Sequence, residues 1–85
     1  MASYSVEVRK SAAKEIAALP RRHCQRVVEK VRALATDPRP HGAEKLSDDN
    51  KYRIRQSDYR VLYEIDEDNK RVTIVRVAHR SEVYR

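Results

Sequence analysis

Cysteine, glycine and long apolar runs are nearly missing from this sequence. Its one cysteine, Cys24, excludes an internal disulfide framework and a cysteine-rich zinc site. No stretch approaches the about 18 consecutive apolar residues that a membrane-spanning helix needs, and the first residues lack the pattern of a signal peptide. We therefore expect a soluble cytoplasmic protein.

The common motifs of catalysis are missing as well. The one glycine, Gly42, cannot supply a glycine-rich phosphate loop, and the sequence has neither a paired-histidine zinc motif nor a serine nucleophile elbow. Cys24 falls among apolar residues at helical spacing, where a buried side chain is far commoner than a catalytic thiol. We expect no cofactor and no metal ion.

Positive charge is what the sequence has in excess. Charged residues make up 38% of the 85 residues, and the formal net charge is +6. Such an excess indicates an anionic partner, which can be a nucleic acid, an anionic membrane surface or an acidic protein. We expect one small domain, residues 1–85, whose stability is marginal because a chain this short buries only about 60–65% of its unfolded surface.

The segment from Lys51 to Ile65 predicts two strands joined by a short turn, because its residues alternate in character with period two. In the first strand, Arg53 and Arg55 share one face. The opposite face of the same sheet receives the apolar and aromatic side chains Tyr52, Ile54, Tyr59, Val61, Tyr63 and Ile65. The polar residues 56–58 are typical of a hairpin connection.

The remaining elements follow from the same periodicities. Residues 4–9 alternate as a first strand, and residues 12–19 and 21–35 have the apolar spacing of two helices, with Ser11 as the expected N-cap of the first. Residues 41–50 are expected to form a loop, and residues 71–77 a last strand. The order is β-α-α-β-β-β, an α+β fold in which a helical hairpin covers one face of a three-stranded antiparallel meander. Arg53 and Arg55 should lie on the other, open face.

Arginines on and after these strands are the main candidate functional residues. Arg53 and Arg55 repeat on one face with no acid close to them in the sequence, which favours a platform for phosphates, because a guanidinium fork binds phosphate bidentately. Arg60 shares its face with Glu64, so an internal salt bridge is the alternative there. Tyr84 can either cap the sheet edge or stack on a base and take part in proton transfer.

Three segments, YRIRQSDYRVLYEID at 52–66, the strand from 71 and VAHRSEVYR at 77–85, resemble a known family. Together with the Leu-Pro between the helices, they look like the RelE/ParE toxin superfamily of bacterial type II toxin–antitoxin modules, over nearly the whole chain. The similarity is greater to the RelE branch, whose members are ribosome-dependent endoribonucleases (mRNA interferases) that cut translated mRNA. The ParE branch shares the fold and inhibits DNA gyrase.

The resemblance implies a role for each candidate in a metal-independent transesterification that leaves a 2′,3′-cyclic phosphate. Arg53 and Arg55 match two basic residues of the second strand, commonly lysines in the family, and would hold the scissile and flanking phosphates. Arg60 and Arg80 would stabilise the transition state, and Tyr84 would stack on a base and transfer a proton.

The general base stays open between two groups. A guanidinium with a pKa above about 12 leaves almost no free base at neutral pH, so the arginines are poorly suited to deprotonate a 2′-hydroxyl. Tyr84 can serve only with a strongly lowered pKa. His79 is of a type that titrates near neutrality, but its side chain can equally face the core.

Three functions remain open on the sequence alone: a ribosome-dependent mRNA endonuclease, a gyrase inhibitor without catalysis, and a weakened homologue that mainly binds its antitoxin. Each implies an acidic antitoxin that covers the basic domain in a hetero-oligomer. The nuclease would in addition bind mRNA and ribosomal RNA. None of the three involves a membrane.

Overall fold

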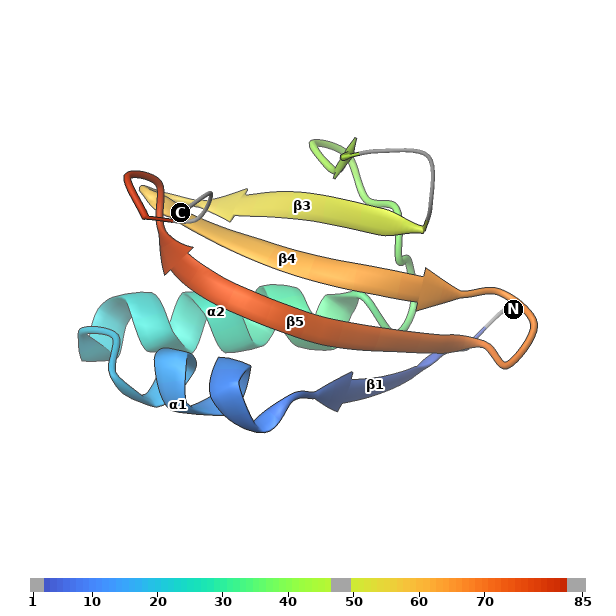
Figure 1. The fold of residues 1–85 in the computed structure, drawn as a ribbon, viewed down its shortest axis with the longest axis horizontal. Coiled ribbons are helices and arrows are strands. Elements are labelled where there is room, and N and C mark those ends of the chain that lie inside the picture. The colour runs from blue at the N-terminus through green and yellow to red at the C-terminus, as the bar shows by residue number, and fades with distance from the viewer. Residues whose placement is uncertain (1–2, 47–49, 83–85) are drawn as a thin grey trace.

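The computed structural model describes residues 3–46 and 50–82, and within them a single sheet carries two helices on one face (Figure 1). The elements are, in chain order, β1 (Ser5–Val8), α1 (Lys10–Ala17), α2 (Arg21–Ala33), β2 (Glu44–Lys45), β3 (Lys51–Gln56), β4 (Tyr59–Asp66) and β5 (Arg71–His79). The predicted α+β fold and its β-α-α-β-β-β order are confirmed. One short strand, β2, is added where the sequence predicts only loop.

The sheet has the order β1-β5-β4-β3-β2. The first strand runs parallel to β5, and every other neighbouring pair is antiparallel. The helical hairpin therefore serves as the crossover that returns the chain to the sheet edge opposite β1. The meander β3-β4-β5 lies at the centre, and the short β2 borders β3 only beside Tyr52 and Arg53.

The core lies between the sheet and the helices, and it follows the predicted alternation. On β4, Val61, Tyr63 and Ile65 are buried. On β5, the register shifts, because Leu62 faces Arg76 while Tyr63 faces Ile74. Val75 is thus an extra residue, and this bulge keeps both Ile74 and Val77 on the helix side although their spacing is odd.

The helix starts differ from the sequence prediction at one point. Helix α1 begins at Lys10 with Arg9 in the N-cap position and no side-chain cap, so the prediction of Ser11 as the N-cap is wrong. Pro20 precedes α2, where its missing N–H costs nothing. Neither described helix is long and apolar enough to cross a membrane.

Candidate functional site

Three of the predicted site residues meet at one end of the open sheet face. Arg55 of β3 lies directly opposite Arg60 of β4, and Arg60 lies opposite Ala78 of β5. Arg80 follows two residues after Ala78, and its backbone N–H donates to the Asp58 carbonyl at 2.7 Å. We call this group, Arg55, Arg60 and Arg80, the arginine end of the sheet.

The arginine end places like charges side by side. Two cations in directly opposite positions of an antiparallel pair repel each other, and Arg55 and Arg60 occupy such positions. Within residues 3–46 and 50–82, no carboxylate forms an ion pair with Arg60 or Arg80. An anion bound between these guanidinium groups would relieve the repulsion and receive several charge-assisted hydrogen bonds.

Arg53, unlike Arg60 and Arg80, has an acidic partner, which it shares with Arg55. Its guanidinium donates to Glu44 Oε2, and the other carboxylate oxygen of Glu44 lies 3.7 Å from Arg55 Nη2. The sequence offers no acid close to Arg53 and Arg55, but the fold brings Glu44 to both of them. The signal was invisible in the sequence, because Glu44 reaches Arg53 only through the pairing of β2 with β3.

Glu64 does not form the alternative salt bridge with Arg60. Glu64 forms its ion pair with Arg9, at 3.8 Å between carboxylate and guanidinium. It also stands opposite Lys51 rather than beside Arg60 in the strand pairing. Arg60 is therefore left for an anion from outside the described chain.

The two candidates for the general base have different outcomes. Tyr84 lies outside the described residues. His79 lies opposite Tyr59 in the β4–β5 pairing, and its ring meets the Tyr59 ring edge-on with centroids 5.7 Å apart. Tyr59 also packs against His23 of α2 at 5.0 Å, so this aromatic group belongs to the helix side of the sheet. The His79 side chain thus faces away from the arginine end.

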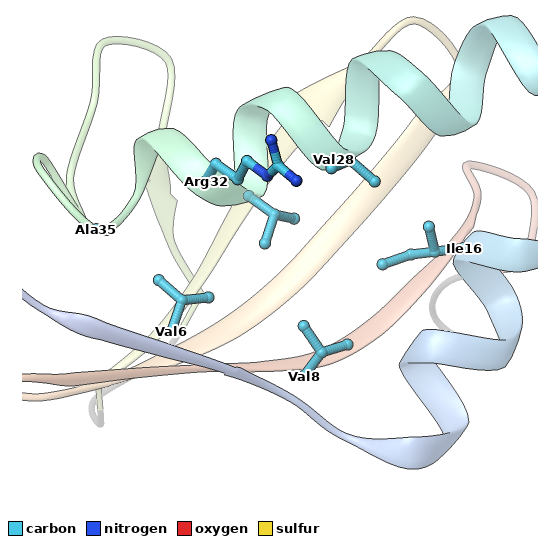
Figure 2. Close-up of a pocket in the computed structure, with 7 residues that line it drawn as sticks. Val6, Val8, Ile16, Val28, Arg32 and Ala35 are labelled. Atoms are coloured by element: carbon cyan, nitrogen blue, oxygen red, sulfur yellow. The ribbon is translucent and has the colours of Figure 1, made fainter.

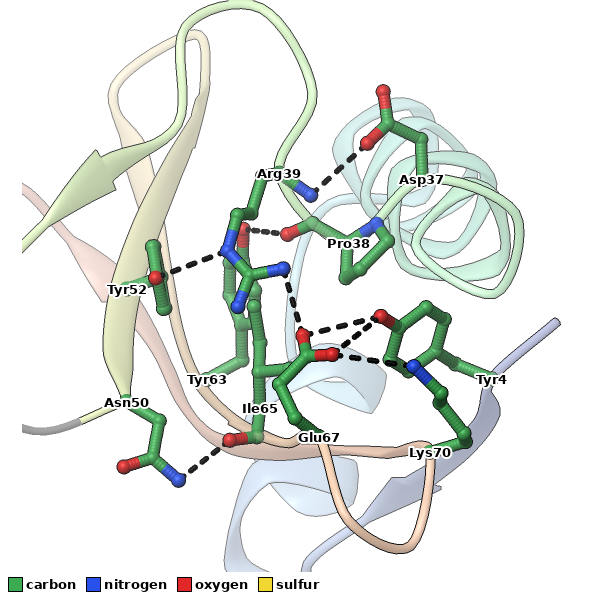
Figure 3. Close-up of polar contacts among 10 residues, drawn as sticks. All are labelled: Tyr4, Asp37, Pro38, Arg39, Asn50, Tyr52, Tyr63, Ile65, Glu67 and Lys70. Carbon is green, nitrogen blue, oxygen red and sulfur yellow. Dashed lines mark hydrogen bonds and ion pairs between the residues drawn. The ribbon is translucent and has the colours of Figure 1, made fainter. Parts of the chain in front are cut away.

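A second polar cluster lies at the opposite end of the sheet (Figure 3). Glu67 accepts hydrogen bonds from the Tyr4 hydroxyl at 3.0 Å and forms ion pairs with Arg39 at 2.8 Å and Lys70 at 3.3 Å. The Arg39 Nε donates to the Tyr52 hydroxyl at 3.1 Å. We call these five residues the Glu67 cluster, and it ties the loop after α2 to Tyr4 ahead of β1, to β3 and to the β4–β5 turn.

The pKa values in the Glu67 cluster reflect these bonds. The Arg39 and Tyr4 hydrogen bonds lower the pKa of Glu67, and the hydrogen bond to Glu67 raises that of Lys70. Beside the cluster, burial raises the pKa of Tyr63 to about 12, and its hydroxyl donates to the Pro38 carbonyl at 2.7 Å. Every charge in the cluster has a partner in the chain. The pKa shifts of Glu67 and Lys70 are therefore those of a structural ion-pair network.

An apolar groove opens on the helix side, between β1 and the two helices (Figure 2). Its volume is about 360 Å³, and its lining is aliphatic, except for Arg32. Val8, which is 39% exposed, and Ile16 form one wall, and Val28 forms another. Exposed aliphatic surface of this kind is typical of a protein-binding surface.

The described residues contain no group of side chains that could bind a metal ion. No three histidine, cysteine, aspartate or glutamate side chains lie close enough together in residues 3–46 and 50–82 to hold an ion. The chemical capacity of the arginine end is therefore that of fixed positive charge and multiple N–H donors, which suits phosphate oxygens.

Comparison with known proteins adds an independent line of evidence. Residues 6–84 match the ParE toxin of the parDE type II toxin–antitoxin system. The chain is 34% identical over 84 residues to the toxin RelE of Mycobacterium tuberculosis, and this match covers 96% of the chain and 87% of the relative.

Two solved structures have the same fold over nearly the whole chain. One is the RelBE2 toxin–antitoxin complex of Mycobacterium tuberculosis, with a TM-score of 0.78 and 30% identity over 91% of this chain and 98% of that one. The other is the archaeal RelE–RelB complex of Pyrococcus horikoshii, with a TM-score of 0.81 and 28% identity over 95% of this chain and 99% of that one.

Proposed function

The chain belongs to the ParE toxin family of type II toxin–antitoxin systems and is RelE-like, and on that premise we propose that it is a ribosome-dependent endoribonuclease that cleaves translated mRNA. The observation that carries this proposal is the arginine end. Arg55 and Arg60 stand directly opposite each other on an open face, beside Arg80. Arg60 and Arg80 form no ion pair with the described residues, so their charges are available to the phosphates of an RNA strand.

The proposed reaction is an attack of the ribose 2′-hydroxyl on the adjacent phosphorus. The 2′-hydroxyl gives its proton to a general base as the new O–P bond closes a 2′,3′-cyclic phosphate. The bond to the 5′-oxygen breaks, and that oxygen takes a proton as it leaves. Negative charge grows on the non-bridging oxygens in the transition state. Guanidinium groups that adjacent strands carry near that position would stabilise the charge, and electrostatic stabilisation of this kind is a large catalytic contribution.

Each residue of the arginine end has a role in this scheme. Arg55 holds the scissile or a flanking phosphate, and Arg60 and Arg80 stabilise the transition state. Arg53 holds a flanking phosphate together with Arg55, and the carboxylate of Glu44, which bridges the two guanidinium groups, opposes that binding. Tyr84 stacks on a base and transfers a proton, because the His79 ring lies on the helix side against Tyr59.

We also propose an acidic antitoxin as the partner that keeps the nuclease silent. The solved relatives include complexes with the antitoxin RelB, and the net charge of +6 favours an acidic segment. Apolar side chains of that segment would fill the groove lined by Val8, Ile16 and Val28. A target on the translating ribosome would place the protein in the cytoplasm.

Primer extension on an mRNA under translation tests the proposal. We expect cuts inside codons that appear only when ribosomes and this protein are both present. Tyr84→Phe and Arg80→Ala should each reduce cleavage at least about 100-fold, since general acid–base and electrostatic contributions are of that order. If both variants cut as the wild type does, the assignment of roles is wrong.

Gyrase inhibition is the second candidate, favoured by the match to the ParE toxin and by arginines at positions where the RelE branch commonly has lysines. A supercoiling assay run beside the primer extension separates the two. Inhibited supercoiling without any cuts would replace the nuclease proposal. Absence of both activities would leave a chain that mainly binds its antitoxin.

A further inference from the structure

A polar hollow of about 330 Å³ opens at the edge of β3, next to the arginine end. Its lining comes from three elements and a loop, namely Lys30 of α2, His41 and Gly42 of the loop, Glu44 of β2 and Arg55 of β3. A smaller cavity of about 110 Å³ adjoins it and shares Lys30 and His41. Neither Lys30 nor His41 stands out in the sequence, because the first belongs to a polar helix face and the second to a loop.

Lys30 is held at this edge by the backbone of the strand. Because β2 pairs with β3 only at Tyr52 and Arg53, the edge beyond them is not covered by β2. The Lys30 ammonium donates to the Arg55 carbonyl at 2.9 Å. An ammonium has three N–H donors, so this bond fixes its position and leaves two donors for a ligand in the hollow.

His41 is presented by a turn that depends on glycine. The Ala43 N–H donates to the Pro40 carbonyl at 3.0 Å, and Gly42 has a φ of 93°. These features are those of a type II turn, which requires positive φ at its third residue. The turn exposes His41 at its second position, on the side of the loop that lines the hollow.

The hollow continues the charge of the arginine end across the strands. Arg55 belongs to both, since it lines the hollow and stands opposite Arg60. The one acid of the hollow, Glu44, is already bound by Arg53 and Arg55. Neighbouring strands are about 4.8 Å apart. Arg80 after β5, Arg60 of β4 and Arg55 of β3 therefore follow one another across the end of the sheet, and Lys30 comes next, because its ammonium reaches the Arg55 carbonyl from α2.

We propose that the hollow binds the backbone phosphate next to the scissile one, through Lys30, His41 and Arg55. Single-stranded RNA then crosses the sheet from the end of β5 towards the loop at 40–43, with the scissile phosphate among Arg55, Arg60 and Arg80. This subsite rests on the proposed nuclease function and adds to it a direction for the substrate and two binding residues.

Cleavage kinetics on ribosomes programmed with a defined mRNA test the subsite. Lys30→Gln and His41→Gln should each raise KM about three- to tenfold and leave kcat within about twofold, because the lost contact holds a phosphate before and during the reaction. Lys30→Arg should restore KM. Lys14→Gln, which removes the same charge from an exposed position of α1, is the matched control and should behave as the wild type.

A neutral linkage in the mRNA identifies which phosphate is bound. In two mRNAs, the phosphate on the 5′ or the 3′ side of the scissile bond is replaced by a methylphosphonate. On one of these two mRNAs, the kcat/KM of the wild type should fall about as far as the kcat/KM of Lys30→Gln falls on unmodified mRNA. On that same modified mRNA, the kcat/KM of Lys30→Gln should fall no further. Losses that add fully for both mRNAs would overturn the subsite and indicate that Lys30 contacts ribosomal RNA instead.

Failure of the subsite and failure of the nuclease proposal give different results. If the wild type cuts mRNA and the KM values of Lys30→Gln and His41→Gln equal that of Lys14→Gln, only the subsite is overturned. A wild type that cuts no mRNA on any ribosome overturns both. Circular dichroism and thermal melting confirm that each variant is folded before its kinetics are compared.

Discussion

Glu44 is the residue whose replacement separates the electrostatics of binding from those of folding. Its carboxylate bridges Arg53 and Arg55 and therefore places a negative charge beside the guanidinium groups that are proposed to bind phosphate. Glu44→Gln keeps the size of the side chain and removes its charge. We expect the variant to cleave mRNA faster at low substrate concentration and to be slightly less stable.

The size of both effects follows from the geometry. A phosphate held across one guanidinium stands about 7 Å from Glu44, where two like charges repel by about 0.6 kcal/mol in water and about 2.4 kcal/mol at an effective dielectric constant of 20. Removal of the charge should therefore raise kcat/KM by about three- to tenfold, towards the weaker end of that range because Glu44 is half exposed. The ion pair itself contributes at most about 1 kcal/mol to the free energy of unfolding, as an exposed pair does.

The assay is ribosomal cleavage at about 0.05 M and about 0.3 M salt, with urea unfolding in parallel, because the repulsion is screened as salt rises. Glu7→Gln is the matched control, since Glu7 is similarly exposed and pairs with Arg71 at 3.7 Å on the far side of the sheet. The reasoning is refuted if folded Glu44→Gln cleaves no faster than Glu7→Gln at the lower salt concentration.

Two further substitutions test other parts of the molecule. Tyr63→Phe should lower the free energy of unfolding by about 1–3 kcal/mol, because the buried Pro38 carbonyl loses its donor. Burial raises the pKa of Tyr63 from 10 to about 12, so the stability that comes from its neutral hydroxyl is fully present below pH 10 and is lost between pH 10 and 12. The difference in free energy of unfolding between the wild type and Tyr63→Phe should therefore shrink over that range in pH-dependent urea unfolding. A difference that stays constant would contradict burial as the cause of the shift. Val8→Glu should weaken antitoxin binding at least about tenfold in calorimetry and leave cleavage unchanged, whereas Ser5→Glu, on the other face of β1, should alter neither.

Much of the fold could be predicted from the sequence because its signals are local. The two-residue alternation of 52–65 predicts two strands and also the face on which each side chain lies. The sequence does not reveal the β5 bulge, because Val75 and Val77 are both apolar and only the strand pairing shows which one faces the helices. Strand β2 is two residues long, and its signal is too short to separate from a loop.

The candidate site was predictable in its residues but not in its partners. Strand periodicity places Arg53, Arg55 and Arg60 on one face without any knowledge of contacts. Glu44 and Lys30 reach Arg55 from elements 11 and 25 residues away, and such contacts depend on tertiary packing that a single sequence does not encode in its pattern. Glu44 changes the expected chemistry, because it already occupies one side of the Arg53–Arg55 pair.

The two ends of the sheet show why charge alone does not identify a functional site. At the Glu67 cluster, one carboxylate is shared by Arg39, Lys70 and the Tyr4 hydroxyl, so the cations there are satisfied within the chain and join separate elements. At the arginine end, Arg55 and Arg60 oppose each other; Arg55 has only the distant oxygen of Glu44, and Arg60 has no ion pair with a described carboxylate. A network that is complete stabilises the fold, whereas like charges held together by strand pairing stabilise whatever anion enters between them. An acidic antitoxin and an RNA strand should therefore compete for the arginine end. Antitoxin should block cleavage even by the Val8→Glu variant once the antitoxin concentration exceeds the weakened Kd.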